Sequence, residues 1–116
     1  MLIAVSQDAL PTGTWYQFSI NTTNSTGTTD HAGCPCLGDQ PLIDGFYVTT
    51  NEFPLFQSGF NWAQVYAMSK AALASGTTPQ VVAFSGLPLA EGSAYTLQPA
   101  ITAQGGLHET ANNGTE

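Results

Sequence analysis

The feature that most constrains the fold is a series of short runs rich in aromatic and β-branched residues, each followed within a few residues by glycine, proline, asparagine or aspartate. These runs fall at residues 2–5, 15–20, 45–51, 62–68, 80–84 and 94–98. Such runs are typical of strands, whereas a helix of ordinary length needs ten or more residues with a period of 3.6. We therefore predict an all-β fold of antiparallel sheets. Periodicity alone does not choose between a sandwich, a barrel and a propeller.

One segment breaks this pattern. Residues 70–74 read KAALA, a run of good helix formers, and Ser69 can cap its start while Gly76 can end it. This spacing predicts one short helix near residues 69–75. Residues 21–33 carry no apolar side chain larger than Ala32, which predicts a long exposed loop. We divide the chain into a β domain over 1–104 and a disordered polar tail over 105–116.

The charge pattern limits the partners of this chain. Only 8% of its 116 residues are charged, and Lys70 is the one basic residue against eight acids, so the formal net charge is −7. Such a chain lacks the cations that neutralise nucleic-acid phosphates or an anionic membrane surface. No apolar stretch reaches the roughly 20 residues that a membrane helix needs. The neutral polar composition, rich in Thr, Asn and Gly, is similar to that of secreted bacterial proteins, so we expect an extracellular or cell-surface location.

The two cysteines are one residue apart, at Cys34 and Cys36. A redox pair usually has the spacing C-x-x-C at the start of a helix, and neither feature is present. A zinc site needs about four ligands, and His31 is the only histidine nearby in the sequence. The interpretation that we favour is structural: a local disulfide, or two half-buried thiols, in a loop. We therefore predict no metal at these residues.

Several longer stretches are similar to those of a known group. They read IAVSQDALPTGTWYQFSI, GCPCLGDQPLIDGFYVTTNEF, GFNWAQVYAMSKAAL and GLPLAEGSAYTLQPA. Together they resemble secreted bacterial β-propeller proteins of uncharacterised function, over about residues 2 to 103. The resemblance implies a partial propeller of about one and a half to two blades, where a full propeller has about four to eight. Where members of the group carry a longer insert with a second acid, this chain has only 42–44, and Asp44 stands in for that acid.

The candidate ligand-binding residues are Asp39, Asn51 and Glu52. Asp39 precedes Gln40-Pro41, so it lies either at the mouth of a central channel, near the start of an innermost strand, or in a turn that its carboxylate stabilises. Asn51 and Glu52 are consecutive at the end of the strand predicted at 45–51, so their side chains point to opposite faces. One of them could bind a sugar or Ca²⁺, and strand-end capping is the simpler alternative. We expect no resident cofactor.

No catalytic motif accompanies these residues. The sequence contains no arginine, no G-x-S-x-G, no H-E-x-x-H and no phosphate-binding glycine loop. We therefore expect a non-catalytic segment of a secreted or cell-surface β-propeller that presents loops to a ligand or partner. The alternative is a fragment of a propeller glycoside hydrolase with an acidic residue at the channel mouth.

The expected partners are neighbouring blades and a carbohydrate or protein ligand. An arc of about two blades exposes apolar faces and unpaired strand edges. The isolated chain is therefore expected to oligomerise, to aggregate or to be only marginally folded.

Overall fold

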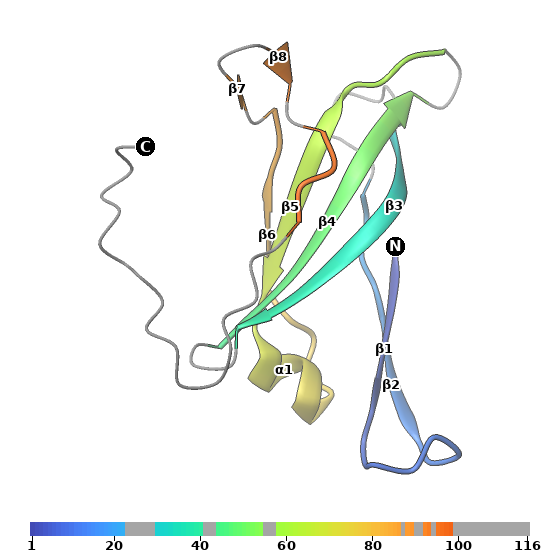
Figure 1. Ribbon diagram of the computed structural model, residues 1–116. Helices are drawn as coiled ribbons and strands as arrows, with labels where there is room; N and C mark the ends of the chain where they lie inside the picture. The colour runs from blue at the N-terminus through green and yellow to red at the C-terminus, as the bar shows by residue number, and fades with distance from the viewer. Residues whose placement is uncertain are drawn as a thin grey trace.

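The structure is a computed structural model that describes residues 1–22, 30–40, 44–54, 58–86, 88–89, 92–93 and 95–98, with residues 30–40, 88–89 and 93 described through their backbone only. Its elements in chain order are β1 (Leu2–Ser6), β2 (Trp15–Ser19), β3 (Asp30–Gln40), β4 (Gly45–Pro54), β5 (Trp62–Met68), α1 (Lys70–Ser75), β6 (Val81–Phe84), β7 (Pro88–Leu89) and β8 (Gly92–Ser93). All strand pairs are antiparallel, so the all-β prediction is confirmed (Figure 1).

Strands β1 and β2, which confirm the runs at 2–5 and 15–20 as strands, pair as an N-terminal hairpin. Leu2 lies opposite Ser19 and Ser6 lies opposite Trp15. The amino group of Met1 donates a hydrogen bond to the Ile20 carbonyl at 2.8 Å, which extends the pairing beyond the strands. In Figure 1 the hairpin lies beside the larger sheet, and it packs onto this sheet through Phe18 and Ile20.

The larger sheet has four strands in the order β3-β4-β5-β6, so each strand lies next to its neighbour in sequence. Strand β5 matches its predicted bounds, and β4 confirms the strand predicted at 45–51 but continues to Pro54. This extension occurs because Glu52 pairs with Trp62 of β5 and Phe53 pairs with His31 of β3.

Strand β3 corrects two sequence-based predictions. The predicted loop at 21–33 is a strand from Asp30 onward, and Cys34 and Cys36 lie in this strand rather than in a loop. Glycine and proline disfavour strands, but pairing with β4 supplies backbone partners along most of this segment. The register shifts between Gly33 and Cys36, a bulge that accommodates Pro35, which has no backbone N–H to donate.

The core lies on one face of the four-stranded sheet. Its buried members are Phe18, Ile20, Val48, Tyr66, Met68 and Leu73. Two come from the β2 segment, three from β4 and β5, and one from α1. The hairpin and the helix therefore cover the same face of the sheet, and burial of these side chains supplies the main driving force for this packing.

Helix α1 confirms the predicted helix and both of its predicted caps. The Ser69 side chain accepts a hydrogen bond from the Ala72 N–H at 3.0 Å, and Gly76 adopts the left-handed conformation with φ 74°. A side chain at Gly76 would collide with the ring of Tyr16. Glycine is therefore required here both for the backbone conformation and for the close contact with the hairpin.

The C-terminal part differs from the prediction. The short strand β7 (Pro88–Leu89), for which the sequence carries no strand signal, pairs with β8. The strand expected at 94–98 was wrong, because Tyr95–Gln98 has no strand structure and Thr96 has φ 50°. This segment is held instead by side chains of β4, as described below. Residues 105–116 lie outside the described part of the chain, so the predicted disordered tail is not tested.

Candidate functional site

A pocket of about 430 Å³ lies between the end of β2 and the strands β5 and β6; we call it the β2–β6 cleft. It is lined by Gln17, Phe18, Ser19, Ile20, Asn21, Tyr66, Thr78, Pro79, Val81 and Ala83. All of these residues are neutral. The cleft combines apolar walls with a few polar groups, the usual composition of a small-molecule site.

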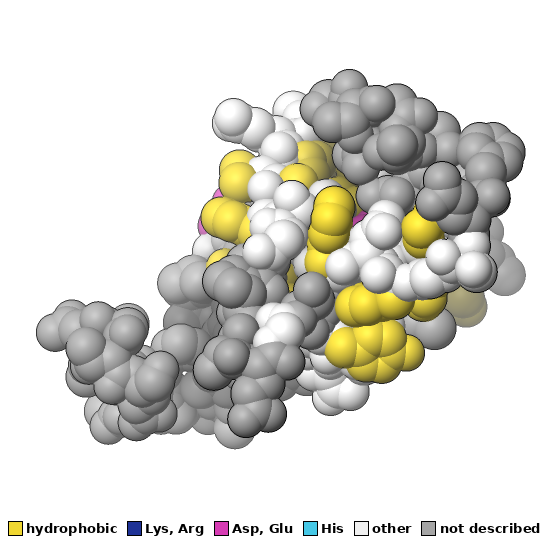
Figure 2. Space-filling model, turned by 90° about the horizontal axis from the view of Figure 1, so that it is seen from above, with side chains coloured by type: hydrophobic (Ala, Val, Ile, Leu, Met, Phe, Trp, Pro, Cys, Tyr) yellow, Lys and Arg dark blue, Asp and Glu magenta, His cyan; other side chains and the backbone are white. Residues whose placement is uncertain are grey.

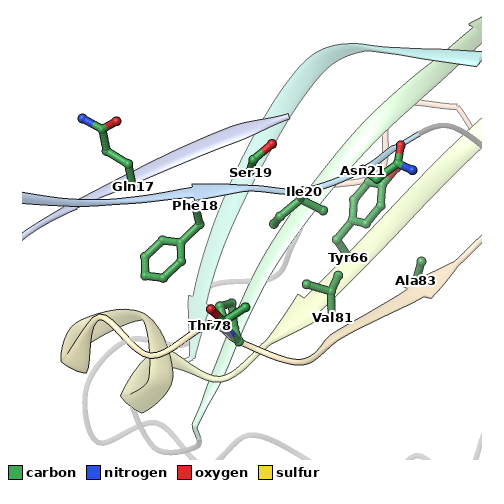
Figure 3. Close-up of a pocket in the computed structure, with 10 residues that line it drawn as sticks. Gln17, Phe18, Ser19, Ile20, Asn21, Tyr66, Thr78, Val81 and Ala83 are labelled. Carbon is green, nitrogen blue, oxygen red and sulfur yellow. The ribbon is translucent and has the colours of Figure 1, made fainter.

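The close-up shows how these side chains divide (Figure 3). Phe18 and Ile20 point from β2 toward the sheet, whereas Gln17 and Ser19 point to the opposite side of the strand, as strand alternation requires. Tyr66 and Val81 rise from β5 and β6 toward the hairpin. Asn21 and Thr78, from segments that follow β2 and α1, supply polar side chains at the cleft.

Tyr66 connects this cleft to a buried carboxyl group. Its hydroxyl lies 3.4 Å from Oε1 of Glu52, and the same oxygen accepts a hydrogen bond of 2.5 Å from the Thr50 hydroxyl. Glu52 is fully buried, with an exposed fraction of 0%, and its Oε2 has no hydrogen-bond partner. Trp62, the cross-strand neighbour of Glu52, has a buried Nε1 that also lacks a partner. Unsatisfied buried polar atoms of this kind are rare.

Asn51 lies on the opposite face of β4, which confirms the predicted alternation with Glu52. Its side-chain amide donates to the Thr96 hydroxyl at 3.0 Å, and its Oδ1 accepts from the Thr96 N–H at 2.9 Å. The neighbouring Thr49 hydroxyl donates to the Leu97 carbonyl at 2.6 Å. Asn51 therefore holds residues 95–98 on the face of the sheet opposite to Glu52. Because β4 continues to Pro54, neither Asn51 nor Glu52 lies at the strand end, as the capping alternative required.

Asp39 is separated from both residues along the sheet. It lies opposite Phe46 in the β3–β4 pairing, whereas Asn51 lies opposite Gly33. Asp39 is the second-last residue of β3, which lies at an edge of the described four-stranded sheet, and its place at the start of an innermost strand stays a prediction. The side chains of Asp39, Cys34 and Cys36 are outside the described part of the structure, so their ligand-binding and disulfide roles remain predictions.

Asp44 has a structural role at the start of α1. Its carboxylate accepts a hydrogen bond from the Ser69 hydroxyl at 2.5 Å and another from the Ala71 N–H at 2.7 Å. The Ser69 hydrogen bond, followed by that from Ala71, lowers the pKa of Asp44 below its ordinary value. Asp44 thus anchors the start of the helix next to β5.

The described residues contain no cluster of three or more His, Cys, Asp or Glu side chains arranged to hold a metal ion. Within the same part of the chain, no helix has the length and apolar character needed to cross a membrane. Figure 2 shows a face on which hydrophobic side chains lie among other side-chain and backbone atoms, with a few acidic atoms and with no lysine or arginine among the described residues.

Comparisons with known proteins provide no relative for this chain. No family model matches it, and neither a curated protein nor a solved structure matches it. The function must therefore be argued from the geometry of the chain itself.

The sequence named Glu52 as a candidate ligand-binding residue, but it did not predict the β2–β6 cleft. Phe18, Tyr66 and Thr78 lie far apart in the sequence, and only the packing of the hairpin on the sheet brings them together. The one available signal was the aromatic content of residues 15–18 and 62–66, which is equally typical of the core of a small β protein. Such a core role holds for Tyr66, which is 1% exposed, but not for Trp15, which is 42% exposed.

Proposed function

We propose that this chain is a non-catalytic segment of a secreted or cell-surface β-propeller, and that the β2–β6 cleft binds a small neutral ligand. The observation that carries this proposal is the cleft itself. Its described lining is neutral and combines apolar walls from Phe18 and Val81 with polar groups from Asn21 and Thr78.

The strand order supports the propeller part of the proposal. A propeller blade is a four-stranded antiparallel sheet, and β3-β4-β5-β6 has the sequential order of such a sheet. The hairpin β1–β2 then supplies two strands of an adjoining blade, packed face to face through Phe18 and Ile20. The chain would thus form about one and a half blades.

The ligand class follows from the charges and groups available. The chain has no arginine and a single lysine, so it is poorly suited to an anionic ligand. Amide and hydroxyl groups beside apolar walls suit a molecule with both hydroxyls and apolar faces. A neutral mono- or disaccharide fits this description, in agreement with the extracellular location suggested by the composition.

Titration calorimetry with maltose, cellobiose, xylobiose and chitobiose tests the proposal. We expect at least one of these sugars to bind, and Thr78→Val to weaken it by about two- to tenfold, because one hydrogen bond contributes about 0.5–1.5 kcal/mol. The matched control is Thr12→Val in the exposed hairpin turn, which should bind as the wild type does. Equal affinities for the two variants would contradict the location of the site.

The same sugars test the rival function, a fragment of a propeller glycoside hydrolase. Two carboxyl groups must face the scissile bond in most such enzymes. Glu52 is fully buried behind Tyr66, so it is poorly placed to contact a substrate. If the full-length protein hydrolyses a glycoside and Asp39→Asn abolishes this turnover, the hydrolase is correct and the non-catalytic proposal is wrong.

A further inference from the structure

The start of β4, the end of β5 and the start of β6 meet at the end of the sheet next to α1 (Figure 1). A pocket of about 300 Å³ lies there, and we call it the Asp44 pocket. Its lining includes Tyr47, Ala67 and Val82, which are cross-strand neighbours and therefore share one face of the sheet. The adjacent residue Tyr66 belongs to the core, so this face points away from the hairpin. The Asp44 pocket is therefore separate from the β2–β6 cleft.

Asp44 gives this pocket a fixed negative charge. Among the described residues of the lining, it is the one with a charged side chain. Hydrogen bonds from the Ser69 hydroxyl and the Ala71 N–H hold its carboxylate in place. The same two hydrogen bonds are the main cause of the lowered pKa of Asp44, and the charge of Lys70 contributes least. The carboxylate is therefore ionised at neutral pH, and the net charge of −7 adds a long-range attraction for cations.

The ring of Tyr47 forms an aromatic wall of the Asp44 pocket. A Cβ at Gly45 would lie 2.8 Å from Cε2 of this ring, so glycine is needed for the ring to lie against the backbone next to Asp44. An aromatic face attracts cations through its quadrupole. The side chain of Val82, which is 46% exposed, adds an apolar surface. The pocket thus combines a carboxylate, an aromatic ring and an aliphatic wall.

We propose that the Asp44 pocket binds a small organic cation, namely an ammonium group that carries methyl or other alkyl substituents. The positive charge pairs with the Asp44 carboxylate and with the ring of Tyr47, and the alkyl groups contact Ala67 and Val82. An anionic ligand would be repelled by Asp44. A metal ion is a poorer occupant, because the described residues contain no group of three or more His, Cys, Asp or Glu side chains that could hold one.

Titration of the ¹⁵N-labelled chain with choline, followed by NMR, tests the proposal. Choline should shift the amide resonances of Gly45, Tyr47 and Val82 with saturation in the millimolar range, and higher salt should weaken binding. The neutral isostere 3,3-dimethylbutanol has the same shape without the charge, so it should bind at least about fivefold more weakly. Equal affinities for the two molecules would show that only apolar contact matters, and they would overturn the proposal.

Two pairs of variants test the residues of the Asp44 pocket. Asp44→Asn should weaken choline binding by about two- to fivefold, while the asparagine oxygen can still accept a hydrogen bond from the Ala71 N–H. Asp8→Asn, which makes the same change in net charge at an exposed position outside the lining, should bind choline as the wild type does.

Tyr47→Leu should weaken choline binding by a similar factor, whereas Tyr47→Phe should keep it, because the phenyl ring retains an aromatic face. No saturable shift up to about 50 mM choline would overturn the proposal. Equal effects of Asp44→Asn and Asp8→Asn, or of Tyr47→Leu and Tyr47→Phe, would overturn it as well. None of these outcomes depends on sugar binding.

Discussion

Replacing Glu52 by glutamine should stabilise the fold. Oε1 of Glu52 accepts hydrogen bonds from Thr50 at 2.5 Å and Tyr66 at 3.4 Å, and the glutamine oxygen can accept both. Removing an ionised carboxyl from water costs several kcal/mol, and the unpartnered Oε2 recovers none of this cost. The amide NH₂ that replaces Oε2 is also unpartnered, which costs about 1–3 kcal/mol. The amide therefore costs less to bury than the carboxyl, and the difference between these two costs predicts a gain of about 1–3 kcal/mol in the free energy of unfolding.

Urea unfolding followed by tryptophan fluorescence measures this effect. The control is Asp8→Asn, which also changes the formal net charge from −7 to −6, but at an exposed position where an asparagine oxygen can still accept from the Leu10 N–H. It should change stability by no more than about 0.5 kcal/mol. A loss of more than about 1 kcal/mol for Glu52→Gln would refute the reasoning, because it would show that Oε2 makes a favourable charge-dependent interaction.

Two further substitutions test the anchoring of α1. The hydrogen bond from Ser69 lowers the pKa of Asp44, so its contribution is complete above the ordinary carboxyl pKa of 3.8 and is lost as pH falls through the lower folded-state value. Asp44→Ala should therefore lower the melting temperature at pH 6, and this difference from wild type should shrink below pH 4; a constant difference would contradict it. Gly76→Ala should destabilise by about 1–3 kcal/mol in urea unfolding, because of its positive φ and the collision with Tyr16, and an unchanged midpoint would refute this contact.

Local signals explain which elements the sequence could predict. Strand β5 and the hairpin β1–β2 follow from short aromatic and β-branched runs, and α1 follows from helix formers between a serine cap and Gly76. Strand β3 contains Gly33, Pro35 and Gly38, so its own residues argue against a strand. It is extended because β4 offers it a partner, and local propensity carries no information about that pairing.

The candidate site could likewise be predicted from the sequence only in part. The opposite faces of Asn51 and Glu52 follow from strand alternation, which is visible in the sequence. The cleft does not, because Ile20 follows β2 whereas Tyr66 lies in β5 of another sheet, and the two meet only after the hairpin packs on β5. The partner of Asn51 could not be predicted either, since Thr96 reaches it through a non-repetitive segment rather than a strand.

The most direct test of the account is to locate a bound neutral sugar by NMR. Titration of the ¹⁵N-labelled chain with maltose, cellobiose, xylobiose and chitobiose should shift the amide resonances of Asn21, Tyr66 and Thr78, which line the β2–β6 cleft. Resonances of Thr12 and Gln98, which lie outside the cleft lining, should not move. Shifts confined to residues outside the cleft, or no shift with any of the four sugars at saturating concentration, would contradict the proposed binding function.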